Sequence, residues 1–159
     1  MDRATARVLV DYLAWADRRV LDRLRLVLPE HWDEPAPAGH GSLGGTVAHL
    51  IGTEWTWLCR LSGQSPRAVG PVRGLRRFTD AETLWPEVWA GWYRVVALRE
   101  PLEQIDYHTT AGTPHQNSTG EILLHVSHHS AAYRGQIVIL LRWLGYSPAG
   151  TDLIEYLRG

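Results

Sequence analysis

Two histidines, His125 and His129, have the spacing in this sequence that most clearly suggests a metal site. They are four positions apart, so in a helix their imidazoles project from the same face, one turn above the other. Two imidazoles placed in this way can share one divalent ion, and imidazole suits zinc, nickel, copper and iron better than magnesium or calcium. The same spacing fits a polar seam whose imidazoles are satisfied by hydrogen bonds. The pair therefore leaves two interpretations open, a metal site and a structural polar contact.

A third histidine, His49, lies in the apolar run 47–51 of another predicted helix. A lone histidine on an apolar face is more often a satisfied core residue than a metal ligand. An imidazole that faces inward nevertheless needs a polar partner. The histidine cluster at 125–129 can supply that partner, so His49 joins His125 and His129 as a candidate ligand.

The other polar candidates have simpler interpretations. His128 lies about 100° round the helix from His129, which points it toward a neighbouring helix or solvent. Glu54 and Glu121 could orient an imidazole through a hydrogen bond, although a capping role is sufficient to explain Glu121. Four further histidines fall in predicted loops and are expected to be exposed: His31, His40, His108 and His115.

Four segments with apolar residues at helical spacing must position these side chains. Their predicted extents are 4–28, 42–62, 79–100 and 118–145. Capping-box patterns, a Ser or Thr followed three residues later by Glu, open the last two at Thr79 and Ser118. A short hairpin around 107–114 and a short packing element at 152–157 complete the prediction. With no strong strand pattern and no internal repeat, the sequence predicts one all-α, up-down four-helix bundle over residues 1–159.

Composition excludes several classes of function. The 159 residues carry 16 basic and 17 acidic side chains for a net charge of −1, and no predicted helix has a basic stripe, so nucleic acid is not an expected partner. No apolar stretch approaches the roughly 20 residues of a membrane span, and the N-terminus shows no signal peptide. The single cysteine, Cys59, excludes an intramolecular disulfide. We therefore expect a cytoplasmic protein whose eight tryptophans lie mostly in the core or at an interface.

Several stretches of the sequence resemble the DinB/YfiT family of metal-binding four-helix bundles. The most specific is 124–136, LHVSHHSAAYRGQ, where the family usually reads roughly His-Val-x-Asn-His-x-x-x-His-Arg-Gly-Gln. The others are YLAWADRRVL at 12–21, TVAHL and EWTWL within 46–58, and TDLIEY at 151–156. Because these stretches cover nearly the whole chain, the resemblance implies a bundle of this type with the family's metal site.

The family's three metal ligands would fall on His49, His129 and Tyr133. Tyr133 departs from the usual histidine, and His128 stands where asparagine is usual. A phenol binds a metal only after it loses its proton, and its ordinary pKa is about 10. Three outcomes stay open: ligation by His49, His129 and Tyr133, ligation by His49, His125 and His129, or no metal.

The resemblance implies a metal-dependent enzyme that uses zinc or nickel. The ion would keep one coordination position open and would lower the pKa of a water or thiol bound there. Some members of the wider family are thiol-dependent S-transferases, so a small molecule or thiol is the expected substrate, in stress response or detoxification. Family members are often dimers, and we assign Arg134 and Gln136 of the family pattern to helix packing or a homodimer contact. The loop 63–78, with its basic residues Arg67, Arg73, Arg76 and Arg77, is expected to cover the pocket and determine substrate choice.

The alternative is a non-catalytic bundle that keeps the fold, has lost the site, and binds a small ligand or dimerises. Tyr133 at the third ligand position supports this alternative. The three histidines His49, His125 and His129 argue against it, because burying them without a metal costs desolvation free energy unless each finds a hydrogen-bond partner.

Overall fold

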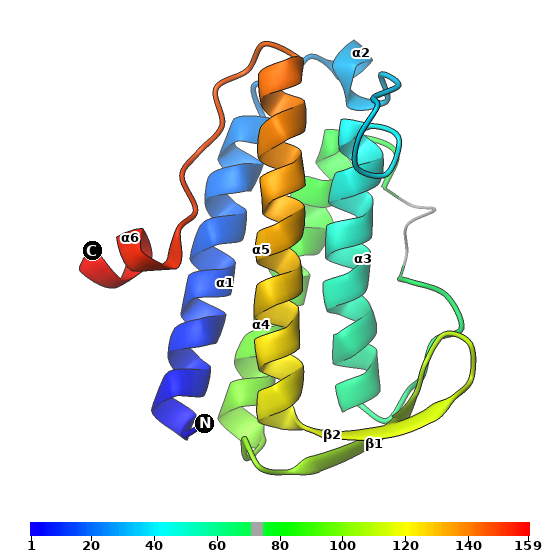
Figure 1. The fold of residues 1–159 in the computed structure, drawn as a ribbon, viewed down its shortest axis with the longest axis vertical. Coiled ribbons are helices and arrows are strands. Elements are labelled where there is room, and N and C mark those ends of the chain that lie inside the picture. The colour runs from blue at the N-terminus through cyan, green and yellow to red at the C-terminus, as the bar shows by residue number, and fades with distance from the viewer. Residues whose placement is uncertain (71–74) are drawn as a thin grey trace.

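The computed structural model of the protein describes residues 1–70 and 75–159. Four long helices form a bundle (Figure 1), with two short helices and one hairpin at its ends and side. The elements are α1 (Arg3–Leu24), α2 (Pro29–Trp32), α3 (Leu43–Leu61), α4 (Phe78–Leu98), β1 (Gln104–His108), β2 (Pro114–Ser118), α5 (Thr119–Trp143) and α6 (Leu153–Arg158). The all-α bundle expected from the sequence is therefore confirmed.

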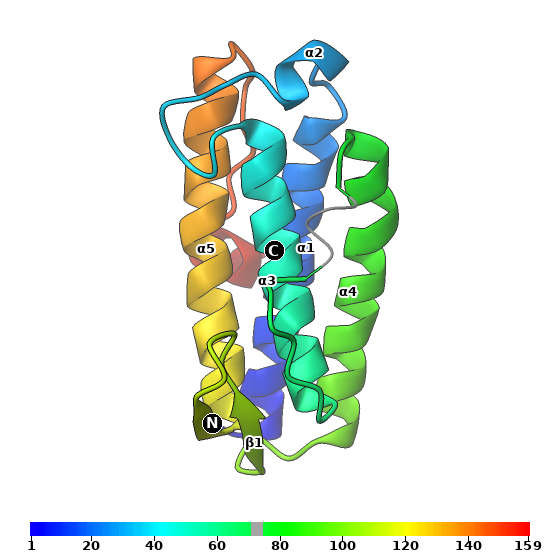
Figure 2. The same cartoon turned by 90° about the vertical axis from the view of Figure 1, so that its right-hand side faces the viewer.

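The helices do not alternate in direction as in an up-down bundle. α3 and α4 both begin at the upper end of the bundle and end at the lower end, whereas α1 and α5 run upward (Figures 1 and 2). α3 packs against α4 and α5, and α1 packs against the same two helices. The connection between α3 and α4 is long enough to return the chain to the upper end, which is why two successive helices can be parallel.

The ends of α3 and α5 follow the predicted capping. Ser42 Oγ accepts a hydrogen bond from the Gly45 N–H at 3.0 Å. At the start of α5, the Glu121 N–H donates to Ser118 Oγ at 3.2 Å, and Glu121 Oε2 accepts from the Ser118 N–H at 2.8 Å. These bonds satisfy N–H groups that a helix N-terminus leaves unpaired. Capping therefore accounts for Glu121, as the sequence suggested.

Two helix ends differ from the prediction. α1 ends at Leu24 rather than residue 28, because Leu28, which fits the apolar period, is 51% exposed and gives its N–H to Tyr146 Oη. Pro29 begins α2 instead of only ending α1. α4 begins at Phe78, and Asp80 caps it by accepting the N–H groups of Arg76 and Arg77, so the capping box predicted at Thr79 is wrong.

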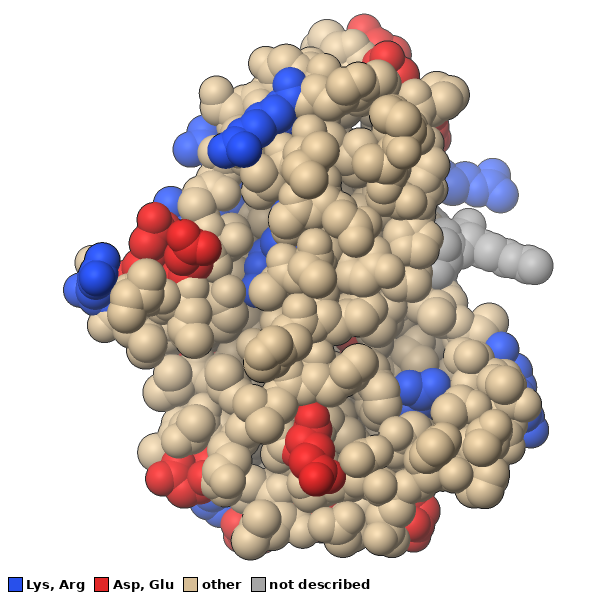
Figure 3. Space-filling model, in the orientation of Figure 1, with Lys and Arg blue, Asp and Glu red and all other residues tan. Residues whose placement is uncertain are grey.

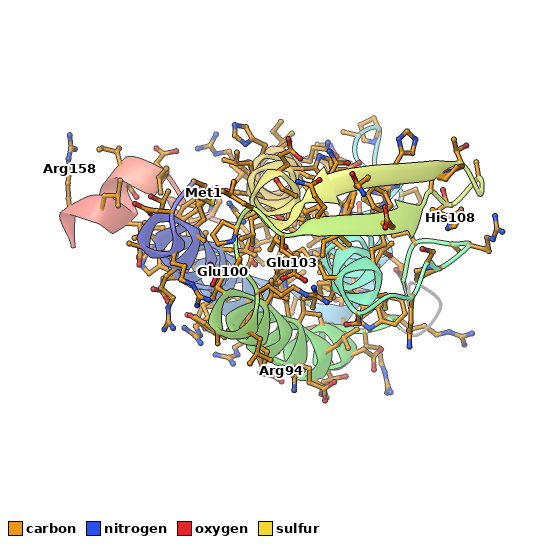
Figure 4. The ribbon with its side chains drawn as sticks, turned by 90° about the horizontal axis from the view of Figure 1, so that it is seen from below. Met1, Arg94, Glu100, Glu103, His108 and Arg158 are labelled. Carbon is orange, nitrogen blue, oxygen red and sulfur yellow. The ribbon has the colours of Figure 1, made fainter. Side chains whose placement is uncertain are left out.

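The predicted hairpin is confirmed and is longer than expected. β1 and β2 pair antiparallel from Gln104 opposite Ser118 to His108 opposite Pro114. The hairpin lies at the lower end of the bundle, where β1 packs on α3 and β2 on α5. Figure 4 views it from below and shows His108 at the far end of the strands, away from the helices. Tyr107 is buried toward the helices.

Tryptophans form much of the core. Four indoles are buried between the helices and loops: Trp32, Trp85, Trp89 and Trp92. Trp143, by contrast, is 49% exposed near the end of α5. Cys59 is buried as a free thiol, as expected. None of the helices within residues 1–70 and 75–159 is long and apolar enough to cross a membrane.

Candidate metal centre

His49 and His129 face each other across the contact between α3 and α5. Their ring centroids are 5.8 Å apart and the ring planes differ by 32°. Two imidazoles that share a tetrahedral zinc ion with bonds of about 2.1 Å have ring centres roughly 5 Å apart. The observed separation is close to that value and is compatible with both rings binding one ion.

Tyr133 lies one turn above His129 on α5 and touches both imidazoles. Its ring centroid is 4.6 Å from that of His49 and 4.5 Å from that of His129. The structure therefore brings together the three residues of the family's ligand positions. The phenol is the weakest of these donors, because it must lose a proton before it binds a metal ion.

His40 is a fourth member of the cluster that the sequence did not indicate. Its ring stacks on His49 with centroids 3.8 Å apart and planes 15° apart, and its Nε2 lies 3.2 Å from Tyr133 Oη. The His40 backbone N–H donates a hydrogen bond to Thr46 Oγ1. The residue before it, Gly39, has a φ of +66°, which lies in the left-handed region that favours glycine. His40 is exposed, as predicted for a loop histidine, but its loop folds back over the site.

His125 extends the cluster toward the lower end of the bundle. Its ring centroid is 5.8 Å from that of His129 and 5.1 Å from that of Trp57. No three His, Cys, Asp or Glu side chains in the described part of the chain form a group that could hold a metal ion. The expected alternative set of His49, His125 and His129 is therefore not assembled, and the rings that do contact one another at the family's ligand positions are those of His49, His129 and Tyr133.

Burial favours the neutral form of three imidazoles, His49, His125 and His129, by lowering the pKa of each. It lowers the pKa of His129 to about 4, with further lowering from His49 and His125. Burial and then the neighbouring His40 also lower the pKa of His49. A neutral imidazole carries the lone pair that a metal ligand needs. His129 Nδ1 is buried and has no hydrogen-bond partner among the described residues, a situation that is uncommon for a buried polar atom.

Glu54 does not orient an imidazole, contrary to the expectation from the sequence. Its side chain is fully buried, and its two carboxyl oxygens accept hydrogen bonds from Trp85 Nε1 at 3.0 Å and Ser130 Oγ at 2.6 Å. Burial and the nearby Asp17 carboxylate raise the pKa of Glu54 well above its ordinary value. Ser130 follows His129 directly, so Glu54 holds the backbone turn of α5 beside His129 and does not contact the His129 imidazole.

The remaining candidates take separate places. Arg134 is buried in the core and bound to Asp17, and Gln136 is half-buried on α5. His128 is exposed, and its Nδ1 lies 2.9 Å from the Leu124 carbonyl oxygen of its own helix. His108 and His115 are exposed on the hairpin, whereas His31 is half-buried against Tyr146.

The loop after α3 was expected to cover the site, and its described part makes other contacts. Ser65 Oγ accepts from the His108 N–H, and the Gly70 N–H donates to Thr56 Oγ1. Arg73 lies outside the described residues. The loop that reaches the candidate ligands is instead the one before α3, which carries His40.

Comparison with known proteins agrees with this architecture. The model of the DinB family matches residues 1–159, so the chain belongs to the DinB family. It is similar to Protein DinB of Bacillus subtilis (strain 168), with 24% identity over 157 residues that cover 94% of this chain and 91% of the relative. Its fold resembles the crystal structure of a DinB-like protein from Bacillus cereus ATCC 10987, with a TM-score of 0.66, 17% identity, and coverage of 88% and 91% of the two chains.

Proposed function

We propose that the protein binds one divalent metal ion, zinc or nickel, through His49, His129 and Tyr133. The observation that carries the proposal is the pair of facing, neutral imidazoles on α3 and α5, with His129 Nδ1 buried and without a described partner. Nitrogen donors with one oxygen donor match the ligand preferences of these ions. Three or fewer protein ligands leave a coordination position for water or substrate.

A metal ion in this position would lower the pKa of a bound water or thiol and so supply a nucleophile at neutral pH. We infer from membership of the DinB family that the substrate is a small molecule or a low-molecular-weight thiol, in a transferase or hydrolase-like reaction linked to stress or detoxification. The neutral state of His49 and His129 supports ligation, because no proton has to be displaced from either ring near pH 7.

Metal content of the purified, tag-free protein tests the proposal. Mass spectrometry and calorimetric titration with zinc and nickel would be run on the wild type, His49→Ala, His129→Ala, and the exposed hairpin variant His108→Ala as a control. We expect near-stoichiometric metal in the wild type and control, and loss in both site variants. Metal that stays in His49→Ala and His129→Ala, or no binding by a folded wild type, would contradict the proposal.

A second function is favoured by one specific observation. The rings of His40 and His49 stack with nearly parallel planes, and in-plane lone pairs of parallel rings do not converge on one ion. Together with Tyr133 in place of a third histidine, this arrangement supports a non-catalytic bundle in which the ring cluster is a structural contact and the protein binds a small ligand or dimerises. A wild type that takes up no zinc or nickel and has the same stability with and without a chelator would favour this function.

We also propose a second copy of the chain as a partner. The outward side of α5 exposes three large apolar residues, Leu124 (43%), Ile139 (59%) and Trp143 (49%), and in Figure 3 the central part of this face is largely free of charged side chains. Charge depletion with exposed apolar and aromatic residues is typical of interface cores. The near-neutral net charge supports neither nucleic acid nor an anionic membrane as a partner.

A further inference from the structure

Arg60, near the end of α3, is a buried cation with no counter-charge among the residues that the structure describes. Its residue exposure is 8%, and its Nε is buried with no hydrogen-bond partner. Across residues 1–70 and 75–159, no carboxylate or carbonyl oxygen bonds to its guanidinium. The contrast within this chain is Arg134, which is buried even more deeply, at 1% exposure, and is paired with Asp17.

Two aromatic rings hold the Arg60 guanidinium in place. Its central carbon lies 4.3 Å from the centroid of the Trp57 ring and 5.2 Å from that of Tyr107. The hairpin fixes Tyr107, because its hydroxyl is hydrogen-bonded to Asn117 Oδ1 at 2.8 Å. Contacts with π-faces stabilise the cation but leave its in-plane N–H donors unused.

The unused donors of Arg60 remain within reach of solvent. Of its three guanidinium nitrogens, Nε is the one that is fully buried without a partner, so the two terminal nitrogens keep some contact with solvent. Burial is the leading cause that lowers the pKa of Arg60, and no carboxylate offsets it. An arginine remains charged in proteins, so this side chain has donors without partners and a positive charge that no described carboxylate pairs with.

Arg60 is connected to the candidate metal centre by a short series of rings. Trp57 lies 5.1 Å from His125, and His125 lies 5.8 Å from His129, centroid to centroid. The charge of Arg60 also reaches His125, whose pKa it helps to lower after burial. A ligand group on Arg60 therefore lies within the length of a small organic molecule from His129.

We propose that Arg60 binds the anionic group, a carboxylate or phosphate, of a small-molecule ligand whose other end reaches His129. An oxyanion would supply both the missing counter-charge and the missing acceptors, and the planar guanidinium matches it in bidentate geometry. The rings of Trp57 and Tyr107 would pack against the ligand's carbon atoms beside that group. The inference rests on the proposed function only for the second end of the ligand, since the anion site itself needs no metal.

The test follows the Arg60 Nε–H signal in metal-free protein by NMR, with acetate and inorganic phosphate as separate probes. We expect a saturable shift with at least one probe, and binding about tenfold weaker in Arg60→Gln, which corresponds to about 1.4 kcal/mol. Arg94→Gln, an exposed arginine on the outside of α4 (Figure 4), is the matched control and should bind as the wild type does. A preference for acetate would identify a carboxylate ligand, and a preference for phosphate a phosphorylated one.

The proposal is overturned if the Arg60 signal of the wild type does not shift with either anion. It is equally overturned if Arg60→Gln binds the probes as tightly as the wild type. Because chelator-treated protein is used throughout, neither result depends on whether His49 and His129 bind a metal. The wild-type titration alone decides the matter if Arg60→Gln does not fold.

Discussion

Arg134 of α5 donates a hydrogen bond from Nη1 to Asp17 Oδ1 of α1 across 2.8 Å, and both side chains are withdrawn from water almost completely. Its Nη2 donates to Tyr12 Oη, and Trp89 Nε1 donates to the other oxygen of Asp17. Burial raises the pKa of Asp17 to about 6, although the Arg134 charge acts in the opposite direction. Through these hydrogen bonds the pair links α1, α4 and α5. Buried polar groups must keep their partners, so the bonds fix how the three helices pack.

Loss of one partner of this pair should be costly. Arg134→Met leaves Asp17 buried without its cation, and we expect the free energy of unfolding to fall by about 3–5 kcal/mol. The measurement is urea unfolding at pH 7, followed by circular dichroism. The double variant Asp17→Leu with Arg134→Met should recover most of this loss, because it removes both charges.

A surface ion pair provides the control for Arg134→Met. Arg7 and Asp11 pair on α1 with side-chain exposures of 58% and 30%, so Arg7→Met should cost less than about 1 kcal/mol. Equal losses in Arg7→Met and Arg134→Met would show that burial of the Asp17 pair does not determine its energetic importance.

The buried Glu54 should make stability depend on pH. Its pKa is raised in the folded state, by burial first and then by Asp17, so the folded chain holds this proton more tightly than the unfolded chain. This stabilisation is complete at pH values below the ordinary pKa of 4.5 and is lost as pH rises toward the raised value. Glu54→Gln keeps a neutral partner for Trp85 and Ser130. We therefore expect its stability relative to the wild type to increase steadily from pH 4.5 to pH 8.

Glu121→Gln is the matched control for this pH series. Glu121 is exposed at the start of α5, and the Ser118 N–H, Asn117 and the Ser118 hydroxyl lower its pKa. Its substitution should give the opposite trend, with a relative loss of stability above pH 4.5. A Glu54→Gln profile parallel to that of the wild type would mean that Glu54 titrates normally in the folded protein.

Gly39 should be required for the position of His40. Its φ is +66°, and a Cβ at this position would lie 2.3 Å from Thr46 Oγ1, the atom that accepts the His40 N–H. We expect Gly39→Ala to lower the free energy of unfolding by about 2 kcal/mol and to shift the His40 ring signals in NMR spectra. Gly41→Ala shares the positive φ but meets no described atom within 4 Å, so it should cost only about 1 kcal/mol. If Gly39→Ala and Gly41→Ala lower the free energy of unfolding equally, the contact with Thr46 Oγ1 is not what makes Gly39 necessary.

The four long helices could be predicted because each has a local signal. Ser42 and Ser118 are N-cap residues in front of apolar periods, and both cap bonds form. The direction of α4 could not be predicted in this way. Periodicity defines which face of a helix is buried, but a connection as long as 62–77 permits either direction. The end of α1 was misjudged because Leu28 continues the apolar period without being buried.

The candidate site was predicted only in part, for a related reason. His49, His129 and Tyr133 are found together because the resemblance to the DinB/YfiT family aligns their two helices. His40 and Arg60 gave no such signal. His40 reaches the cluster through a glycine-rich loop, and Arg60 is covered in part by Tyr107, which the hairpin brings against α3. Contacts made by loops depend on tertiary packing, which residue spacing does not encode.

The apolar face of α5 should mediate dimer formation. Ile139→Glu places a charge on this face, where Ile139 is 59% exposed in the single chain, and we expect the dissociation constant of the dimer to rise about tenfold or more. Sedimentation equilibrium measures the change. Leu102→Glu, at a 76% exposed position after α4, should leave the association unchanged. A wild type that is monomeric at millimolar concentration would refute the proposed dimer.

Replacement of Tyr133 separates its two proposed roles. Tyr133→His supplies a third imidazole one turn above His129, and since imidazole needs no deprotonation near pH 7, zinc affinity should rise about tenfold or more. Tyr133→Phe removes the phenol oxygen and keeps the ring contacts with His49 and His129, so its zinc affinity should fall while its stability stays within about 1 kcal/mol of the wild type. Calorimetric titration with zinc at several pH values measures both. If Tyr133→Phe binds zinc as the wild type does, the phenol is not a ligand, and the two histidines must hold the ion with solvent alone.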